Sequence, residues 1–129
     1  MGRFKMINYN IQREHIEGLI LSCFLNQHRT LEMDKMEFEA YKLPFELFKA
    51  NNTHRLIAKA IYNLQCEKLP VDDVNVHAYI TKRAKLNEDE YLQVHSYTWC
   101  SFETMLSYLK QLQSLDDEEK RIELIKGLR

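Results

Sequence analysis

The stretch Asn52–Leu64 constrains the fold of this chain most, because its apolar residues form one continuous stripe along a helix. The stripe consists of Leu56, Ile57, Ala60, Ile61 and Leu64. A helix of period 3.6 places these positions on one face, and no charged residue interrupts that face. Asn52 or Thr53 is suited to capping the first turn, because a short side-chain oxygen accepts an orphan backbone N–H. The stripe predicts a central helix with neighbours on more than one side.

The rest of the chain also favours helices. Its 129 residues include only three glycines and two prolines, and Asn-Gly and Asp-Gly turn signals are absent. Residues with high helix propensity dominate. The length is typical of one domain, which can bury enough surface to fold without disulfides or metal. We therefore expect an all-α protein, a compact bundle of about six helices with an appended C-terminal helical hairpin.

Apolar spacing and capping residues place the expected elements along the chain. The expected helices are Ile11–Asn26, Thr30–Tyr41, Asn52–Cys66, one opened by Asp72, a short one opened by Asn87, Phe102–Gln113 and Leu115–Leu128. A short helical turn is expected after Pro44. The run Ser114–Asp117 predicts a break between the last two helices. We expect residues 1–9 to be a disordered leader or a remnant of an expression vector, residues 10–100 the bundle, and residues 101–129 the hairpin.

Three features of the first helix bear on packing. Ile16, Leu19, Ile20, Cys23 and Phe24 repeat at helical spacing and predict a buried face, with Cys23 as a small core residue. On the same spacing, three charged residues are expected to face water: Arg13, Glu14 and Glu17. Gly18 predicts a close approach by another helix, because glycine inside a helix otherwise costs about 1 kcal/mol.

The sequence lacks the motifs of common catalytic and cofactor sites. Three glycines cannot build a phosphate-binding loop, and the five histidines show no metal-ligand spacing. Cys100 follows His95 closely, but no oxyanion-donor motif accompanies the pair, so we expect no catalytic residue. We predict no metal, no cofactor, no small-molecule substrate and no catalysis by this chain.

The net charge and the hydropathy of the chain limit the classes of partner that it is expected to bind. The net charge of −1 creates no overall electric field that would attract nucleic acid or an anionic membrane. No apolar run reaches transmembrane length, and the odd, scattered cysteines favour a reducing cytoplasm. Lys82, Arg83 and Lys85 form a local basic patch beside Tyr79. The patch is interpreted as a solvated helix end, with a small nucleic-acid-binding module as an alternative.

Several short motifs resemble a known family. Asn10–Leu25 resembles the first helix of the N-terminal domain of DnaB-family replicative helicases. Pro44–Phe48 (PFELF) and His54–Ile57 (HRLI) resemble the family's P-x-D-F-Y and H-R-L-I motifs, and Leu69–Asp72 (LPVD) resembles its E-P-I-D. The same helical fold occurs in the C-terminal, helicase-binding domain of DnaG-type bacterial primases. The resemblance implies a protein-docking domain of the replication primosome.

The two relatives differ in the last helical segment of the domain. In the helicase, the segment after the last loop runs on as a long uninterrupted helix. Here Ser114–Glu119 is expected to break that helix, and the final capped segment resembles the closing helix of the primase. The primase domain is therefore the first expectation. It would belong to a DNA-directed RNA polymerase whose catalytic domains are absent here. The N-terminal domain of the helicase is the alternative.

Each relative implies its own partner. The primase domain would dock onto the collar of the replicative helicase and couple primer synthesis to the fork. The helicase domain would self-assemble and receive the primase. Carried onto this sequence, the resemblance implies contacts on the terminal hairpin at Tyr108, Leu109, Leu112, Glu119, Arg121, Ile122, Ile125 and Leu128.

Overall fold

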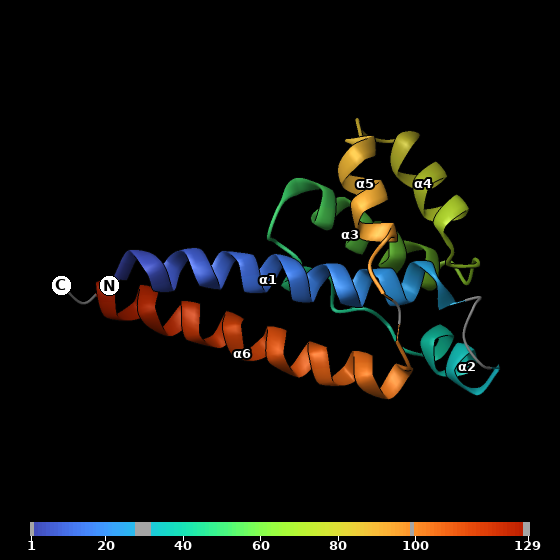
Figure 1. The fold of residues 1–129 in the computed structure, drawn as a ribbon. Helices are drawn as coiled ribbons and strands as arrows, with labels where there is room; N and C mark the ends of the chain where they lie inside the picture. The colour runs from blue at the N-terminus through green and yellow to red at the C-terminus, as the bar shows by residue number, and fades with distance from the viewer. Residues whose placement is uncertain (1, 28–31, 99, 128–129) are drawn as a thin grey trace.

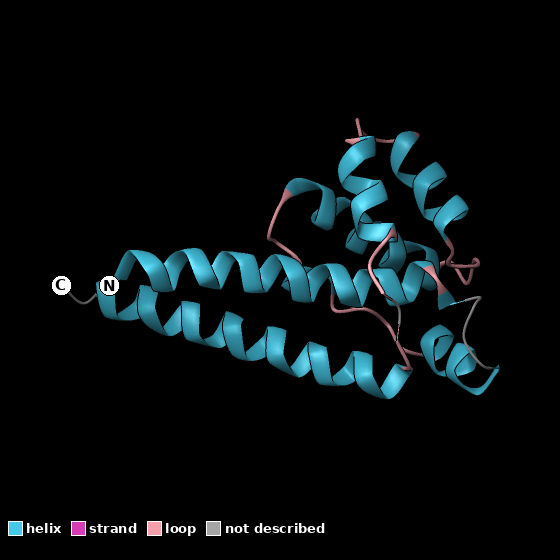
Figure 2. Cartoon of the chain, in the orientation of Figure 1, coloured by secondary structure: helices cyan, strands magenta, loops and turns pink. Residues whose placement is uncertain are grey.

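The structure is a computed structural model that describes the backbone of residues 2–27, 32–98 and 100–127. Side chains in these ranges are described except those of residues 2–11 and 32. The elements are α1 (Gly2–Leu25), α2 (Glu32–Ala40), the 3-10 turn η2 (Phe45–Leu47), α3 (Asn52–Cys66), α4 (Asp73–Thr81), α5 (Glu88–His95) and α6 (Phe102–Gly127). No strand occurs in the described ranges, and loops join the helices (Figure 2). The all-α prediction is confirmed.

Helix α1 is the centre of the molecule. It lies between α6 on one side and the group of α3, α4 and α5 on the other, while α2 packs near the start of α6 (Figure 1). Every side chain from Ile20 to Gln27 is buried. A helix that is buried all round needs neighbours on every side. The prediction that Asn52–Leu64 forms the central helix is therefore wrong in position, because α1 fills that role.

Helix α3 nevertheless forms as the apolar stripe predicts. It spans Asn52–Cys66, and Ile57, Ala60, Ile61 and Leu64 are buried on one face. The predicted cap is displaced by one residue, because Asn51 accepts the His54 N–H at 2.8 Å. The predicted caps of the next two helices are confirmed, with Asp72 accepting from Asn75 N–H and Asn87 accepting from Glu90 N–H.

The two ends of the chain differ from expectation. Helix α6 runs without a break through Ser114–Asp117, so the predicted terminal hairpin is wrong. Asp116 does not cap a new helix, because its side chain is buried and pairs with Arg13 of α1 and with Lys49. Residues 2–9, expected as a disordered leader, form the first turns of α1.

Gly18 makes room for an aromatic ring. A methyl group added at Gly18 would lie 2.5 Å from Cε2 of Tyr97, in the segment that joins α5 to α6. The hydroxyl of Ser22, one turn further along α1, donates to the Tyr97 carbonyl at 2.7 Å. The predicted close approach at Gly18 is therefore present, but the neighbour is a tyrosine ring in a connection and not another helix.

The sequence predicts no transmembrane segment, and the helices of the structure can be checked for one. Within the part of the chain that the structure describes, no helix combines the length and the apolar character needed to cross a bilayer.

Candidate functional site: the helical arm and its polar base

Helices α1 and α6 run in opposite directions, so the start of α1 lies beside the end of α6 (Figure 1). At these free ends of the two helices, the described backbone of the other elements does not lie against the pair (Figure 1). We call residues 2–12 and 121–127 the arm.

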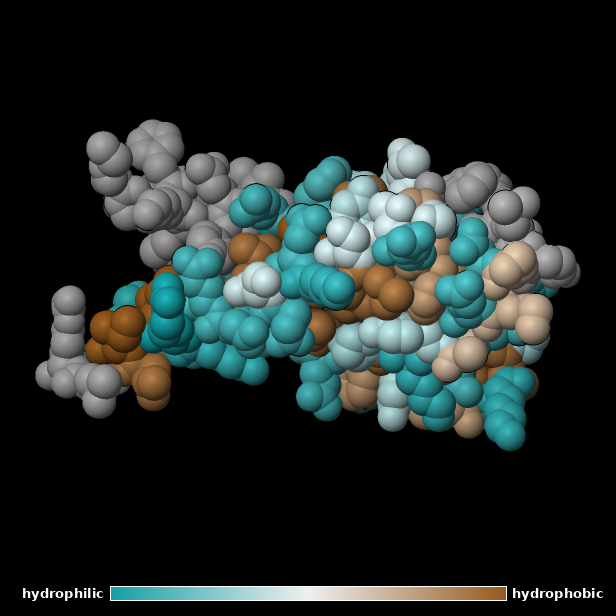
Figure 3. Space-filling view, turned by 90° about the horizontal axis from the view of Figure 1, so that it is seen from below, coloured by the Kyte–Doolittle hydropathy of each residue, from teal (hydrophilic) through white to brown (hydrophobic). Residues whose placement is uncertain are grey.

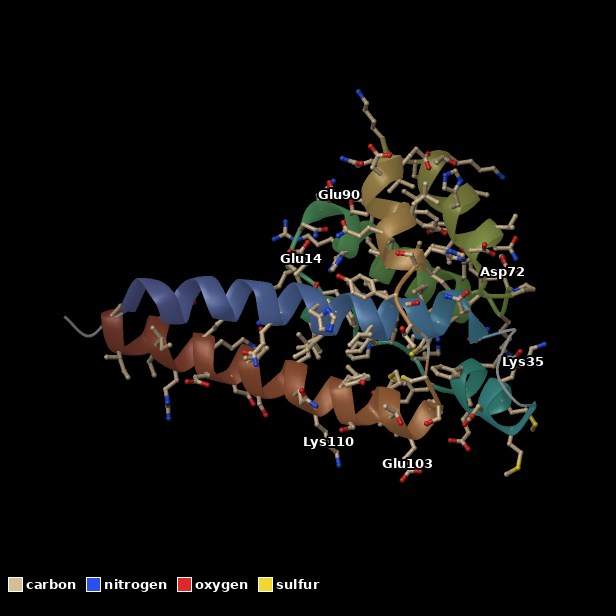
Figure 4. All side chains as sticks on the ribbon, in the orientation of Figure 1. Glu14, Lys35, Asp72, Glu90, Glu103 and Lys110 are labelled. Carbon is tan, nitrogen blue, oxygen red and sulfur yellow. The ribbon has the colours of Figure 1, made fainter. Side chains whose placement is uncertain are left out.

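The α6 side of the arm exposes large apolar side chains. Ile122, Leu124 and Ile125 are 40%, 68% and 52% exposed. Figure 3 shows apolar surface at this end of α6, near the C-terminus. Nearer the start of α6, Glu103 and Lys110 point away from α1 into solvent, as a surface helix requires (Figure 4). Adjacent exposed apolar side chains of this size are typical of contact surfaces.

A buried carboxylate on α1 holds the connection between η2 and α3 against this helix. Glu17 is fully buried. The backbone N–H groups of Lys49 and Ala50 donate to its carboxylate at 3.1 and 3.2 Å, and Nδ1 of His54 lies 2.9 Å from Oε1. Glu17 therefore holds the connection between η2 and α3 against α1. The expectation that Glu17 faces water is wrong.

Arg13 extends this network to α6. Its guanidinium is buried and makes a two-pronged contact with the Glu119 carboxylate, with Nε and Nη2 donating at 3.2 and 3.1 Å. Nη1 also donates to the Leu47 carbonyl at 3.1 Å and to Glu17 at 3.4 Å. Arg13 is thus also wrongly predicted to face water. Glu14 is exposed as predicted and points away from α1 (Figure 4).

Asp116 is the buried acid of α6 at the base of the arm. Lys49 Nζ lies 2.6 Å from Oδ1, and Lys120 Nζ lies 3.1 Å from Oδ2. Burial alone would raise the pKa of the Asp116 carboxyl, but the hydrogen bonds and positive charges of Lys49 and Lys120 hold that pKa below its ordinary value. The hydrogen bond to Asp116 in turn raises the pKa of Lys120. The base of the arm therefore depends on an ionised Asp116.

The substitution Asp116→Asn is expected to lower the free energy of unfolding by about 1–3 kcal/mol near neutral pH, because hydrogen bonds to a charged acceptor are lost. Since the native pKa lies below the ordinary value of 3.8, the unfolded chain takes up this proton first as the pH falls. The difference between the two proteins should be constant above the ordinary pKa and should close as the pH falls through the native one. Urea unfolding from about pH 7 to about pH 2 measures this difference.

The matched control is Asp117→Asn. The exposed Asp117 accepts a hydrogen bond from Gln113 at 3.0 Å and has no lysine contact comparable to that of Asp116 among the described side chains. Its substitution should change the free energy of unfolding by no more than about 0.5 kcal/mol. A difference between wild type and Asp116→Asn that stays constant down to the lowest pH would contradict the proposed role of the ionised carboxylate.

The structure places the predicted partner-contact residues in different environments. Leu109 and Leu112 lie in the core at 6% and 0% exposure, so neither contributes to an exposed surface. Tyr108 is half-buried, and Glu119 is held by Arg13. Arg121, Ile122 and Ile125 are exposed on the arm, and Leu128 lies outside the described residues. Leu109 and Leu112 are buried because they lie with Met105 on the side of α6 that packs against α1.

The exposed apolar residue Leu124 was missed by the sequence analysis. It lies between Ile122 and Ile125 and was left out of the predicted stripe, because it does not share their helical face. The arm exposes more than one face of α6, so Leu124 is as accessible as the predicted residues.

The basic patch at the end of α4 is only partly free. The Arg83 guanidinium lies 3.6 Å from the centre of the Tyr79 ring, and its Nη1 donates to the Tyr79 carbonyl at 3.0 Å. Arg83 therefore covers one face of the ring on which a base would stack. Lys82 and Lys85 are exposed.

The residues considered for chemistry are not assembled into a site. His95 Nε2 lies 3.1 Å from Asp73, whereas the Cys100 sulfur lies against Cys23 at 3.0 Å. Among the described residues, no group of three or more histidine, cysteine, aspartate or glutamate side chains is placed to hold a metal ion.

Comparison of the chain with protein-family models, with curated proteins and with solved structures gave no match. The resemblance to the helicase and primase domains therefore stays a prediction, and the arm and its base carry the functional argument.

Proposed function

We propose that this chain is a non-catalytic, cytoplasmic protein-interaction domain of the bacterial replication primosome, and that the arm is its docking surface. The observation that carries this proposal is the exposure of Ile122, Leu124 and Ile125 on an unbroken α6, which projects beyond the body of the molecule. A projecting helix end with exposed apolar anchors is suited to helix–helix docking.

Between the two relatives, the unbroken α6 favours the helicase N-terminal domain. The choice of the primase depended on a break at Ser114–Glu119, which the structure does not contain. A long last helix is instead the feature that the resemblance associates with the helicase. In this proposal the domain self-associates through its arm and receives a DnaG-type primase. The primase C-terminal domain, which would bind the helicase collar, is the competing assignment.

The network at the base supports a docking role for the arm. Arg13 holds Glu119, and Lys49 and Lys120 hold Asp116, so the last part of α6 is fixed before the exposed residues begin. A surface that is ordered before binding loses less entropy on association. The exposed apolar residues would supply most of the affinity. Arg121 and the neighbouring charges would fix how the arm is aligned along its partner.

The double substitution Ile122→Ala and Ile125→Ala is expected to weaken self-association and primase binding by roughly 10- to 100-fold, because both apolar anchors are removed. Sedimentation of the chain alone at micromolar concentration measures self-association, and calorimetric titration with the cognate primase or helicase measures binding. Circular dichroism should show unchanged helicity, since both side chains are exposed.

The matched control is Val74→Ala with Leu92→Ala, an exposed apolar pair on α4 and α5 with 71% and 62% exposure. This pair should leave assembly and binding unchanged. A wild-type chain that stays monomeric and binds the helicase would support the primase assignment over the helicase one. A chain that neither self-associates nor binds either protein would contradict the docking proposal.

The nucleic-acid alternative is less well supported. Lys82 and Lys85 offer two exposed cations, but Arg83 is stacked on the neighbouring Tyr79. Salt-dependent binding of single-stranded DNA that is lost in a Lys82→Ala, Lys85→Ala variant would favour this alternative.

A further inference from the structure

The segment between α5 and α6 places two distant cysteines in contact. Cys23 lies two residues before the end of α1 and is fully buried, and Cys100 lies two residues before α6 and is half-buried. Their sulfur atoms are 3.0 Å apart, and the Cys100 backbone N–H donates to the Cys23 sulfur at 3.3 Å. The third cysteine, Cys66, is exposed on α3.

The geometry leaves only a small movement between this contact and a covalent bond. A disulfide requires a sulfur–sulfur distance of about 2.05 Å, so the two atoms must approach by about 1 Å. Cys23 is held in a buried helix, but Cys100 belongs to the connection between α5 and α6 and is itself not helical. Such a connection can supply the shift without breaking a helical hydrogen bond.

The contact also makes the two thiols unequal. The hydrogen bond from Cys23 lowers the pKa of the Cys100 thiol, although burial and the nearby Asp34 act in the opposite direction. The hydrogen bond with Cys100 and burial raise the pKa of the Cys23 thiol. Cys100 is therefore the thiol of the pair that loses its proton more readily, and it is also the more accessible of the two.

We propose that Cys23 and Cys100 are a reversible redox site that closes to an intramolecular disulfide on reaction with a low-molecular-weight disulfide such as oxidised glutathione. The Cys100 thiolate attacks one sulfur of the oxidant, whose sulfur–sulfur bond breaks and releases a glutathione thiolate. The Cys23 thiol then loses its proton and attacks the Cys100 sulfur, which releases the second glutathione. Two protein thiols are oxidised, one glutathione disulfide is reduced, and the released thiolates take up the two protons.

Oxidation would fix the start of α6 to α1. The connection already contacts α1 through the bond from Ser22 to the Tyr97 carbonyl, and the Phe102 N–H lies 3.4 Å from Asp34 Oδ1 of α2. A covalent link between residues 77 positions apart removes much of the freedom of the unfolded chain. This inference concerns the body of the molecule and does not depend on the docking role of the arm.

The test is incubation of the full chain with oxidised glutathione at neutral pH, followed by intact-mass measurement, thiol counting and mapping of linked peptides. We expect the mass to fall by two hydrogen atoms, the free thiols to fall from three to one, and a Cys23–Cys100 peptide to appear. Thermal unfolding of the oxidised protein should shift upward by roughly 10 °C. Dithiothreitol should reverse all of these changes.

Three single variants make the result specific. Cys66→Ser should still form the disulfide, whereas neither Cys100→Ser nor Cys23→Ala should form an intramolecular bond. If Cys23→Ala does not fold because its site is buried, the Cys100→Ser variant still tests whether the bond needs this pair of cysteines. The proposal is overturned if wild type accumulates only a glutathione adduct on Cys66 while Cys23 and Cys100 stay reduced. It is also overturned if the mapped disulfide includes Cys66.

Discussion

Replacing Glu17 by alanine is expected to lower the free energy of unfolding by about 3–5 kcal/mol, because a buried charge network loses its central acid. The change leaves the N–H groups of Lys49 and Ala50 without their acceptor and removes the carboxylate beside His54 and Arg13. Each orphaned buried group adds a desolvation cost. Urea unfolding followed by circular dichroism measures the loss.

A matched substitution separates this effect from a change in helix propensity. Glu14→Ala removes the same side chain from the same helix, but Glu14 is exposed and its hydrogen bond from Asn51 is long, at 3.4 Å. Its effect should stay within about 0.5 kcal/mol. Glu17→Gln should lie between the two, since an amide oxygen can still accept from the backbone but carries no charge. Equal stability of Glu14→Ala and Glu17→Ala would rule out the structural role assigned to the network.

The substitution Phe38→Ala is expected to cost about 3–5 kcal/mol and to loosen α2 from the bundle. Phe38 is fully buried between Phe24 of α1 and Phe102 of α6, with ring centres 5.1 and 5.2 Å away in edge-to-face contact. Edge-to-face pairs add to the energy of apolar burial. Hydrogen exchange should show faster opening of Glu32–Ala40 than in wild type, and chemical denaturation gives the loss of stability.

Helix α2 supplies its own control. Met36 lies on the same helix but is 68% exposed, so Met36→Ala should change stability by no more than about 0.5 kcal/mol. If Phe38→Ala proved as stable as Met36→Ala, the aromatic cluster would not be what holds α2.

Local sequence patterns were sufficient to predict a helix wherever residues within that helix fix its ends. The bounds of α3, the caps of α4 and α5, and the short turn after Pro44 were all predictable, because apolar spacing and capping oxygens act within a few residues. The same reasoning failed at Ser114–Asp117. The polar residues there resemble a helix cap. Asp116 instead stays inside the helix, because Arg13 and Lys49, which are distant in sequence, form ion pairs with its side chain.

The candidate site shows a similar division. Ile122 and Ile125 were predicted as contact residues and are exposed on the arm, whereas Leu109 and Leu112 were predicted with them and lie in the core. The two pairs were expected on separate helices, so their faces could not be compared. On the unbroken α6, the 16 positions from Leu109 to Ile125 turn the helix by about 160°, which places Ile125 nearly opposite the side that packs on α1. The separation depends on where α1 covers α6.

The sequence by itself determined that the chain is helical, the bounds of α3 and the starts of α4 and α5, since these properties depend on neighbours within about one helical turn. Only the tertiary structure decided that α1 is the central helix, that Arg13 and Glu17 are buried, and that Cys23 meets Cys100. Arg13 and Glu119 are 106 positions apart, and the two cysteines are 77 apart. Contacts over such separations arise from the packing of whole helices, and burying a charged side chain becomes favourable only when that packing supplies its partner.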